Sequence, residues 1–257
     1  MNSNRQILGA LNPYFDQIYI LTLPHAQDRQ ESVKMLMDGL NWRFFYGVDK
    51  EGLSMERVIK QGIYDDGAHR RTKRTHRSMT LPEVACALSH RAIYQDAVDN
   101  QYEKILIFED DVLPCYDKLE YFPDMIGQLP KDWDLIMFGY YGEKRSSLKS
   151  WLQQQIYKVF RQLHLFNWHI VNKRWLEKLC MVNYSTDFFS IGKVLGTHAY
   201  AVNVQTAKNF IEYQTPIKLQ ADRVFNYYLS EYDLKAFAPK QPLFTLSALS
   251  KISQIQT

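Results

Sequence analysis

The chain has 257 residues, 46% of them hydrophobic and 23% charged, values typical of a folded globular protein rather than a disordered one. The formal net charge of +3 is too small to indicate a nucleic-acid-binding protein, and we expect no nucleic-acid partner. Three widely spaced cysteines, with no CxxC pair, exclude a zinc-finger pattern and a disulfide framework.

Targeting signals are absent from the sequence pattern. Residues 1–17 lack the charged segment and long apolar core of a signal peptide. No apolar stretch approaches the ~20 residues that a membrane-spanning helix needs. We therefore expect a cytoplasmic location.

Strand and helix patterns alternate from the N-terminus. Residues 17–24 predict a strand, and residues 25–41 carry apolar side chains at helical spacing. Residues 43–49 predict a second strand with Asp49 at its carboxyl end. These three elements together have the size of one βαβ unit. Residues 50–80 are polar and basic and predict a long excursion from the sheet.

The alternation continues through the rest of the chain. A helix at 81–100, strands at 104–113 and 134–142, a helix within 145–179, a strand at 196–203, helices at 204–214 and 221–233 and a strand at 234–239 are expected. Such alternation predicts one α/β domain over residues 1–257, with a mostly parallel central sheet flanked by helices.

The stretch KILIFEDDVL, residues 104–113, runs from a buried type of strand into three carboxylates. Ligands of open α/β sheets bind beyond the carboxyl ends of strands, where these acids lie. Because side chains alternate along a strand, Glu109 and Asp111 would point to one side and Asp110 to the other. Such a pair offers oxygen ligands to one Mg²⁺ or Mn²⁺, which takes further ligands from substrate phosphates. Acids that begin a solvated loop, or that pair with arginines, are the alternative.

Two basic segments complement the acids. Residues 69–77, HRRTKRTHR, could close over a diphosphate, attract a phosphorylated acceptor or be a solvated surface stretch. Residues 145–179 combine an apolar helical face with lysines and arginines. This segment either packs on the sheet as a core helix or lies on the inner face of a membrane.

Residues 83–113, EVACALSHRAIYQDAVDNQYEKILIFEDDVL, resemble the signature of glycosyltransferase family 25. The family includes bacterial lipooligosaccharide galactosyltransferases and collagen β-galactosyltransferases. The resemblance continues in order over roughly residues 17–230. The matching positions are Arg29, Asp49, Glu83, Ala85, Cys86, Ser89, His90, Glu109, Asp110, Asp111, Gly196, Thr197, Tyr200 and Asp222.

The resemblance implies a GT-A-like fold that transfers a sugar from a UDP-sugar donor with inversion, using Mn²⁺ or Mg²⁺. Residues 17–142 would form the nucleotide-sugar-binding half and residues 143–257 the acceptor-side half. The implied reaction moves galactose from UDP-galactose to a lipooligosaccharide or lipopolysaccharide core, with UDP-glucose as the alternative donor. The collagen-directed branch is disfavoured because residues 1–17 show no secretion signal. A lipid-linked acceptor implies peripheral contact with the cytoplasmic face of the inner membrane.

The resemblance also implies roles for single residues. Inverting transfer needs a general base, for which Asp222 is the first candidate and Glu83 the second. A helix N-cap is the structural alternative for Asp222. Glu109 and Asp111 are expected to hold the metal. His198 stands where the family pattern does not require histidine, and a half-buried strand histidine is favoured over a third metal ligand. The expected donor-binding residues are Arg29, Asp49, Asp110, His90, Gly196 and Thr197.

Two other functions are open on the sequence. A nucleotidyltransferase would use the same acids with two metals, but the chain has only 11 glycines and no Gly-rich phosphate-binding loop. A non-catalytic family member that binds a nucleotide sugar is the second, and retention of the acids argues against it.

Overall fold

A computed structural model describes residues 2–72, 77–142 and 145–247. Within them, one sheet has the strand order β2-β1-β3-β8-β5-β9-β7-β6. Six of these strands point the same way, and β8 and β7 run against them. The predicted α/β class, with a mostly parallel sheet, is confirmed. The strands are β1 (Gln17–Thr22), β2 (Trp42–Tyr46), β3 (Lys104–Glu109), β5 (Leu135–Tyr141), β6 (Val182–Asn183), β7 (Phe188–Ser190), β8 (Leu195–Asn203) and β9 (Ala236–Pro239).

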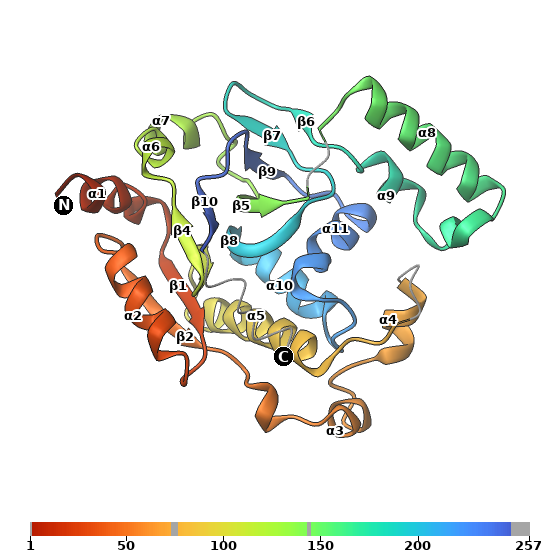
Figure 1. Ribbon diagram of the computed structural model, residues 1–257, viewed down its shortest axis with the longest axis horizontal. Helices are drawn as coiled ribbons and strands as arrows, with labels where there is room; N and C mark the ends of the chain where they lie inside the picture. Colours follow the sequence, from red (N-terminus) through yellow and green to blue (C-terminus); the bar gives the residue numbers. More distant parts are fainter. Residues whose placement is uncertain (1, 73–76, 143–144, 248–257) are drawn as a thin grey trace.

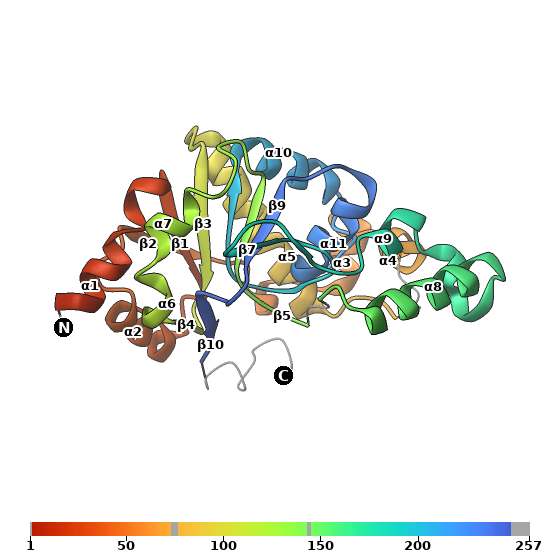
Figure 2. The same cartoon turned by 90° about the horizontal axis from the view of Figure 1, so that it is seen from above.

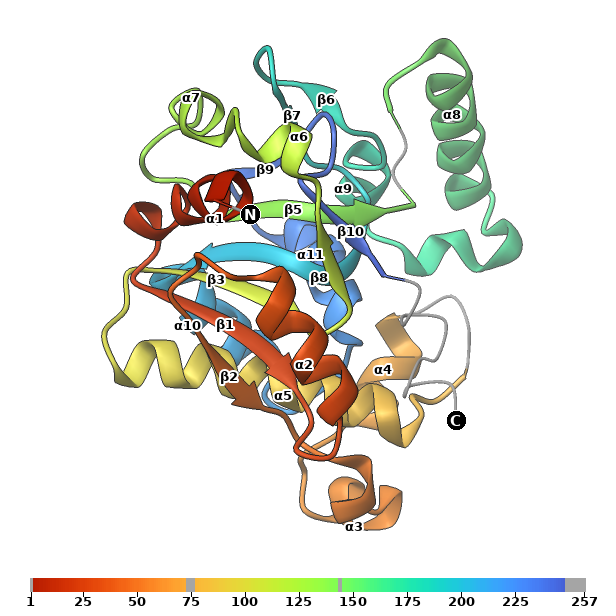
Figure 3. The ribbon, with the colours of Figure 1, turned by 60° about the vertical axis from the view of Figure 1, so that its left-hand side comes forward.

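Helices cover both faces of the sheet (Figure 1). One face is covered by α5 (Leu81–Asp99), α10 (Val204–Tyr213) and α11 (Ala221–Glu231), and the other by α1 (Asn2–Gly9), α2 (Gln27–Leu36), α6 (Tyr116–Leu119) and α7 (Phe122–Ile126). Figure 3 shows α2 and α6 in front of the sheet and α5, α10 and α11 behind it. Alternate residues of β3 supply the two cores: Ile105 and Ile107 face α5, and Leu106 and Phe108 face the opposite layer.

The predicted strand at 104–113 divides into two elements. β3 ends at Glu109, Asp110 and Asp111 form a turn, and β4 (Val112–Pro114) follows. β4 pairs with β10 (Phe244–Leu246) in a separate antiparallel sheet. The simple alternation argument for the three acids is therefore wrong, because a turn rather than an extended strand carries the last two.

The polar excursion at 50–80 contains η2 (Lys50–Gly52), α3 (Met55–Lys60) and α4 (Asp66–Thr72). These elements pack against the start of α5 through a third apolar cluster that includes Val58, Tyr64 and Val84. Of the basic segment predicted at 69–77, residues 73–76 lie outside the described residues. Arg70 pairs with Asp66 within α4.

A lobe of α8 (Leu148–Gln162), η3 (Leu165–Ile170) and α9 (Lys173–Glu177) projects from one end of the molecule (Figure 2). The lobe has its own small cluster, centred on Trp168, Val171 and Leu176. No residue of α8 is fully buried, so of the two alternatives for this segment, a core helix packed on the sheet is wrong. One further short element, η1 (Asn12–Tyr14), lies between α1 and β1. Among the described residues, no helix has both the length and the apolar character to cross a membrane.

Candidate active site

A cleft of about 730 Å³ opens at the carboxyl ends of β1, β2 and β3. Because β8 runs antiparallel to β3, the start of β8 meets the end of β3 and completes the cleft floor. Residues of α5 and of the first turn of α11 also line the cleft. Nine of the ten site residues predicted from the sequence line this cleft: Arg29, Asp49, Glu83, Glu109, Asp110, Asp111, Gly196, Thr197 and Asp222.

Asp110 is fixed by two neighbours. Its carboxylate accepts a hydrogen bond from Thr22 Oγ1 at 2.6 Å and one from Arg29 Nη1 at 2.7 Å. Its side chain is buried, so both bonds are shielded from water. Asp110 therefore holds the turn after β3 and orients Arg29 toward the cleft, and its predicted donor contact stays a prediction.

Glu109 lies between β8 and α5. Thr197 Oγ1 donates a hydrogen bond to Glu109 Oε1, and His90 Nε2 lies 3.4 Å from the same oxygen. Burial opposes ionisation of this carboxyl, but the contacts from His90 and Thr197 outweigh it and lower the pKa of Glu109. Glu109 is therefore held as an anion at the cleft floor.

Asp111 is the least satisfied of the three acids. Its Oδ1 atom is buried and has no hydrogen-bond partner among the described residues. Burial and the charge of Glu109 raise the pKa of Asp111 to about 7, although Arg29 Nη1, 3.9 Å from Oδ2, acts against that rise. A buried carboxylate oxygen without a donor needs a proton or a cation.

These contacts fit a divalent cation held by Glu109 and Asp111. Both supply hard oxygen ligands, which Mg²⁺ and Mn²⁺ prefer. Cys86, His90 and Glu109 form a second group, whose ligand atoms lie within 4.8 Å of one another. Burial and nearby acids raise the pKa of the Cys86 thiol well above its ordinary value, which disfavours the thiolate that metals bind. The oxygen pair is the better fit.

Two histidines predicted near the site are both buried, and of the two only His198 lines the cleft. His90 is buried beneath the floor, outside the cleft lining, and its Nδ1 bonds to Tyr200 Oη at 2.8 Å. Its position supports Glu109 from below. His198 is a buried strand histidine that stacks on Tyr141 and hydrogen-bonds the backbone of Phe244. Burial lowers the pKa of His198, in keeping with a neutral ring.

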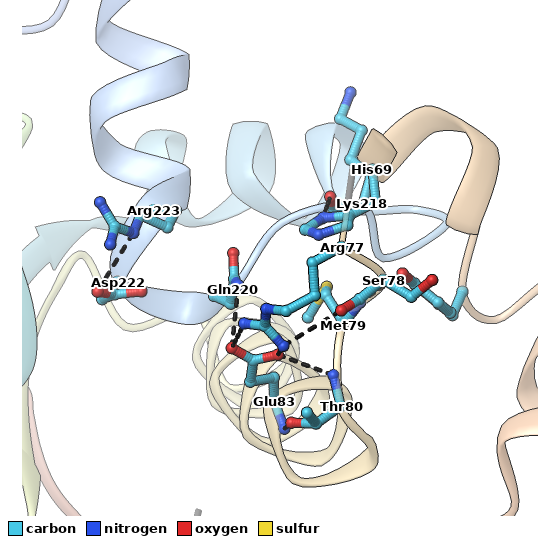
Figure 4. A network of polar contacts seen from close by, with 11 residues as sticks. His69, Arg77, Ser78, Met79, Thr80, Glu83, Lys218, Gln220, Asp222 and Arg223 are labelled. Atoms are coloured by element: carbon cyan, nitrogen blue, oxygen red, sulfur yellow. Dashed lines mark hydrogen bonds and ion pairs between the residues drawn. The ribbon is translucent and has the colours of Figure 1, made fainter. Parts of the chain in front are cut away.

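Glu83 is engaged in a network at the start of α5 (Figure 4). It forms a capping box with Thr80, accepts hydrogen bonds from both Nη atoms of Arg77 at 3.1 and 2.7 Å, and accepts one from Gln220 Nε2 at 3.0 Å. Burial alone would raise its pKa, but these donors lower it to about 2. A carboxylate with so low a pKa is a poor proton acceptor, so the expectation of Glu83 as a base is disfavoured.

Asp222 occupies the first turn of α11 and faces the cleft. Gln220, not Asp222, is the N-cap residue, so the structural alternative of a capping Asp is wrong. Figure 4 shows Asp222 beside Arg223, on the far side of Gln220 from Glu83. The charges of Asp222 and Glu109 both raise the pKa of Tyr141, after burial. Both acids therefore lie near the Tyr141 side chain.

The walls of the cleft are fixed by a glycine and two polar contacts. Asp49 Oδ1 accepts from the backbone N–H of Glu51 at 3.0 Å, and Oδ2 lies 3.2 Å from His25 Nδ1. Asp49 therefore caps η2 while it lines the cleft. Gly196 has φ +106°, and a Cβ there would meet His198 Nδ1 and Tyr141 Cε1 at 3.0 Å, so only glycine fits.

Several lining residues have no signal in the sequence. Thr22, His25, Tyr141 and Gln220 reach the site through contacts between distant segments. Tyr141 is the last residue of an apolar strand. Because ligands bind beyond the carboxyl ends of such strands, its position could have identified it as a cleft residue. Ser89, which was predicted only from the family pattern, accepts a hydrogen bond from the backbone of Val48 and so fixes the loop after β2.

Comparison with known proteins agrees with this geometry. Residues 15–225 match the family model described as glycosyltransferase family 25 (LPS biosynthesis protein). A glycosyltransferase 25 family member of Drosophila melanogaster is 35% identical over 104 residues, covering 38% of this chain and 16% of that protein. Procollagen galactosyltransferase 2 of Homo sapiens is 29% identical over 140 residues, covering 52% of this chain and 22% of that protein.

A third relative, procollagen galactosyltransferase 1-A of Xenopus laevis, is 30% identical over 141 residues, which cover 51% of this chain and 22% of that protein. The matched segment thus spans about a fifth of the length of these relatives. The family model, in contrast, covers most of this chain. The chain belongs to glycosyltransferase family 25.

Proposed function

We propose that this chain is a metal-dependent, inverting galactosyltransferase that uses UDP-galactose and a lipooligosaccharide or lipopolysaccharide core as the acceptor. The family supports glycosyl transfer, and the names of two relatives support galactose. The description of the matched family as an LPS biosynthesis protein supports the lipopolysaccharide acceptor. Such a lipid-linked acceptor places the reaction at the cytoplasmic face of the inner membrane.

One observation carries the proposal. Asp111, with a buried and unsatisfied oxygen, lies near Glu109 and Arg29 in a cleft that Asp222 also lines. Arg29 is anchored on Asp110 and presents positive charge where a diphosphate would lie. This combination of an acid pair, a fixed arginine and a further acid at the start of α11 suits donor binding by the first two and proton removal by the last.

Different residues of the cleft would carry out different steps of the sugar transfer. Glu109 and Asp111 would hold a Mn²⁺ or Mg²⁺ ion, whose charge stabilises the departing diphosphate. Arg29 neutralises phosphate charge directly, and Gly196 lets the backbone approach the donor closely. Asp222 takes the proton from the acceptor hydroxyl while that oxygen bonds to the anomeric carbon and the bond to the diphosphate breaks.

Donor turnover tests the proposal. Purified protein is incubated with UDP-galactose, UDP-glucose and other nucleotide sugars, with truncated core glycans as acceptors, in Mn²⁺ or in EDTA. We expect UDP release and product from UDP-galactose, both lost in EDTA. Preferential turnover of UDP-glucose would show that UDP-glucose, not UDP-galactose, is the donor. Saturable UDP binding without release from any donor would replace the proposal with a non-catalytic nucleotide-sugar-binding protein.

A further inference from the structure

The outer face of α8 carries an exposed apolar stripe. Six apolar residues of this face are between 47% and 75% exposed: Leu148, Trp151, Leu152, Ile156, Val159 and Leu163. At about 100° per residue they form one continuous band along the helix. A band of this length on the surface of a soluble domain marks a contact with another molecule or with a membrane.

The orientation of α8 is fixed by its inner face. Tyr157 stacks on Trp168 with ring centroids 4.1 Å apart. Gln154 Nε2 donates to the carbonyl of Leu176 at 2.5 Å, and Arg161 Nε donates to the carbonyl of Val171 at 2.9 Å. Because these contacts hold the inner face of α8 against η3 and α9, the apolar stripe points away from both.

Lysines flank the stripe. Residues 145–176 contain no acidic residue and six cations: Arg145, Lys149, Lys158, Arg161, Lys173 and Arg174. On the helical wheel, Lys149 and Lys158 lie on opposite sides of the stripe. Lys173 pairs with Glu177 and Arg174 with Asp233, so Lys149 and Lys158 are the cations that carry the argument at the edges of the stripe.

We propose that the outer face of α8 docks on an anionic lipid surface. An amphipathic helix with a Trp- and Leu-bearing face and flanking lysines lies in the plane of a membrane interface, its apolar side among the acyl chains. Anionic headgroups attract the lysines, and the stripe supplies the apolar contact. The lobe thereby attaches the protein to a membrane surface without a spanning helix.

Pairing of two copies through this face is disfavoured by charge. In a twofold-symmetric pair the same patch faces itself, so the cations of one lobe would lie against those of the other. An anionic surface instead complements both the apolar band and its rim. A lipid bilayer with anionic headgroups is therefore the occupant that this face fits.

The lobe is joined to the cleft by a short connection. β5 ends at Tyr141, which lines the cleft, and α8 begins at Leu148. Figure 3 shows β5 pointing toward the side of the molecule from which α8 projects. Docking would thus hold the cleft near sugars at the membrane surface. That role in acceptor access rests on the proposed function, whereas lipid binding itself does not.

Vesicle flotation tests the docking. The chain is mixed with phosphatidylcholine vesicles, or with vesicles that also contain phosphatidylglycerol, at low and high salt. We expect flotation with the anionic vesicles, at least about tenfold weaker binding to the neutral ones, and weakening by salt. Absence of binding to anionic vesicles, or equal binding to both kinds, would overturn the proposal.

Two double variants separate the stripe from its cations. We expect Trp151→Gln/Ile156→Gln to abolish flotation, and Lys149→Glu/Lys158→Glu to weaken it at least tenfold. The matched controls change exposed residues on other helices and loops and should bind normally: Met35→Gln/Ile59→Gln and Lys60→Glu/Lys131→Glu. Variants that float like the unmodified chain would place the lipid contact elsewhere.

Two further measurements distinguish failure of the lipid-docking proposal from failure of the proposed function. Sedimentation should show that the unmodified chain is a monomer. If the chain instead forms a dimer that Trp151→Gln/Ile156→Gln dissociates, and does not bind vesicles, the partner of the stripe is a second copy of the chain and not a lipid surface. UDP release with soluble donor and soluble acceptor should be the same in both lobe variants as in the unmodified chain. Lipid binding without UDP release would leave the docking intact and contradict the proposed function alone.

Discussion

The cleft and the α8 lobe use charge in opposite ways. In the cleft, Asp110 is buried and is held by short contacts from Thr22 and Arg29. In the lobe, cations and large apolar side chains are exposed on a helix that has no fully buried residue. Buried, fixed groups suit chemistry that needs defined positions, whereas an exposed band suits a fluid surface. Substitutions in the two regions should therefore differ in kind.

The largest effect is expected for Asp222→Asn. Loss of a general base lowers turnover by roughly 10²- to 10⁴-fold, while UDP binding stays within about twofold, because the donor side of the cleft is untouched. Steady-state kinetics and UDP calorimetry measure the two quantities. Asp28→Asn, on the exposed side of α2, is the matched control. Normal turnover in Asp222→Asn would place the base elsewhere.

A second prediction separates two neighbouring acids. Asp111→Asn should abolish Mn²⁺-dependent UDP binding without lowering the melting temperature, because the raised pKa of Asp111 makes its charge unfavourable in the metal-free fold. Asp110→Asn should lower the free energy of unfolding by about 1–3 kcal/mol, because it weakens buried bonds to Arg29 and Thr22. Calorimetry and thermal melts distinguish them. The same response from both variants would contradict their separate roles.

The network around Glu83 should produce a pH-dependent effect. The pKa of Glu83 is lowered to about 2, so its contribution to stability is present above its ordinary value of 4.5 and is lost as the pH falls toward 2. With allowance for solvent screening, Glu83→Gln should cost roughly 1–2 kcal/mol at pH 7 and less at pH 3. Urea unfolding at both values measures this difference. A constant cost across that range would exclude the Arg77 pairing as its source.

The smallest effect is expected in the lobe. Trp151→Gln removes an exposed side chain and should change the free energy of unfolding by no more than about 0.5 kcal/mol. Phe108→Ala, in the buried part of β3, should cost about 3–5 kcal/mol under the same urea titration. A comparable cost at Trp151 would mean that the stripe supports the fold rather than a contact with lipid.

The sequence was most informative where one segment decides its own structure. Apolar runs such as Ile105–Phe108 identified the central strands, because strands buried on both faces are apolar throughout. The reverse direction of β8 could not be predicted, since its pairing with β3 joins segments far apart in the chain. The break at Asp110 was missed for the same reason: β4 pairs with β10 near the C-terminus.

The candidate site shows the same limit. The family pattern brought together the acids of the cleft, and their placement on one floor agrees with it. It could not show that the Glu83 carboxylate accepts hydrogen bonds from Arg77 and Gln220, because no local pattern encodes those partners. Nor could it decide between a buried and an exposed α8, since one apolar helical face is compatible with either.

The most direct test of the account is a crystal structure of the chain with UDP and Mn²⁺, in which the anomalous signal of manganese locates the ion. The account predicts the ion against the carboxylates of Glu109 and Asp111, with the diphosphate beside Arg29. Manganese at Cys86 and His90 instead, or UDP bound outside the cleft, would contradict it.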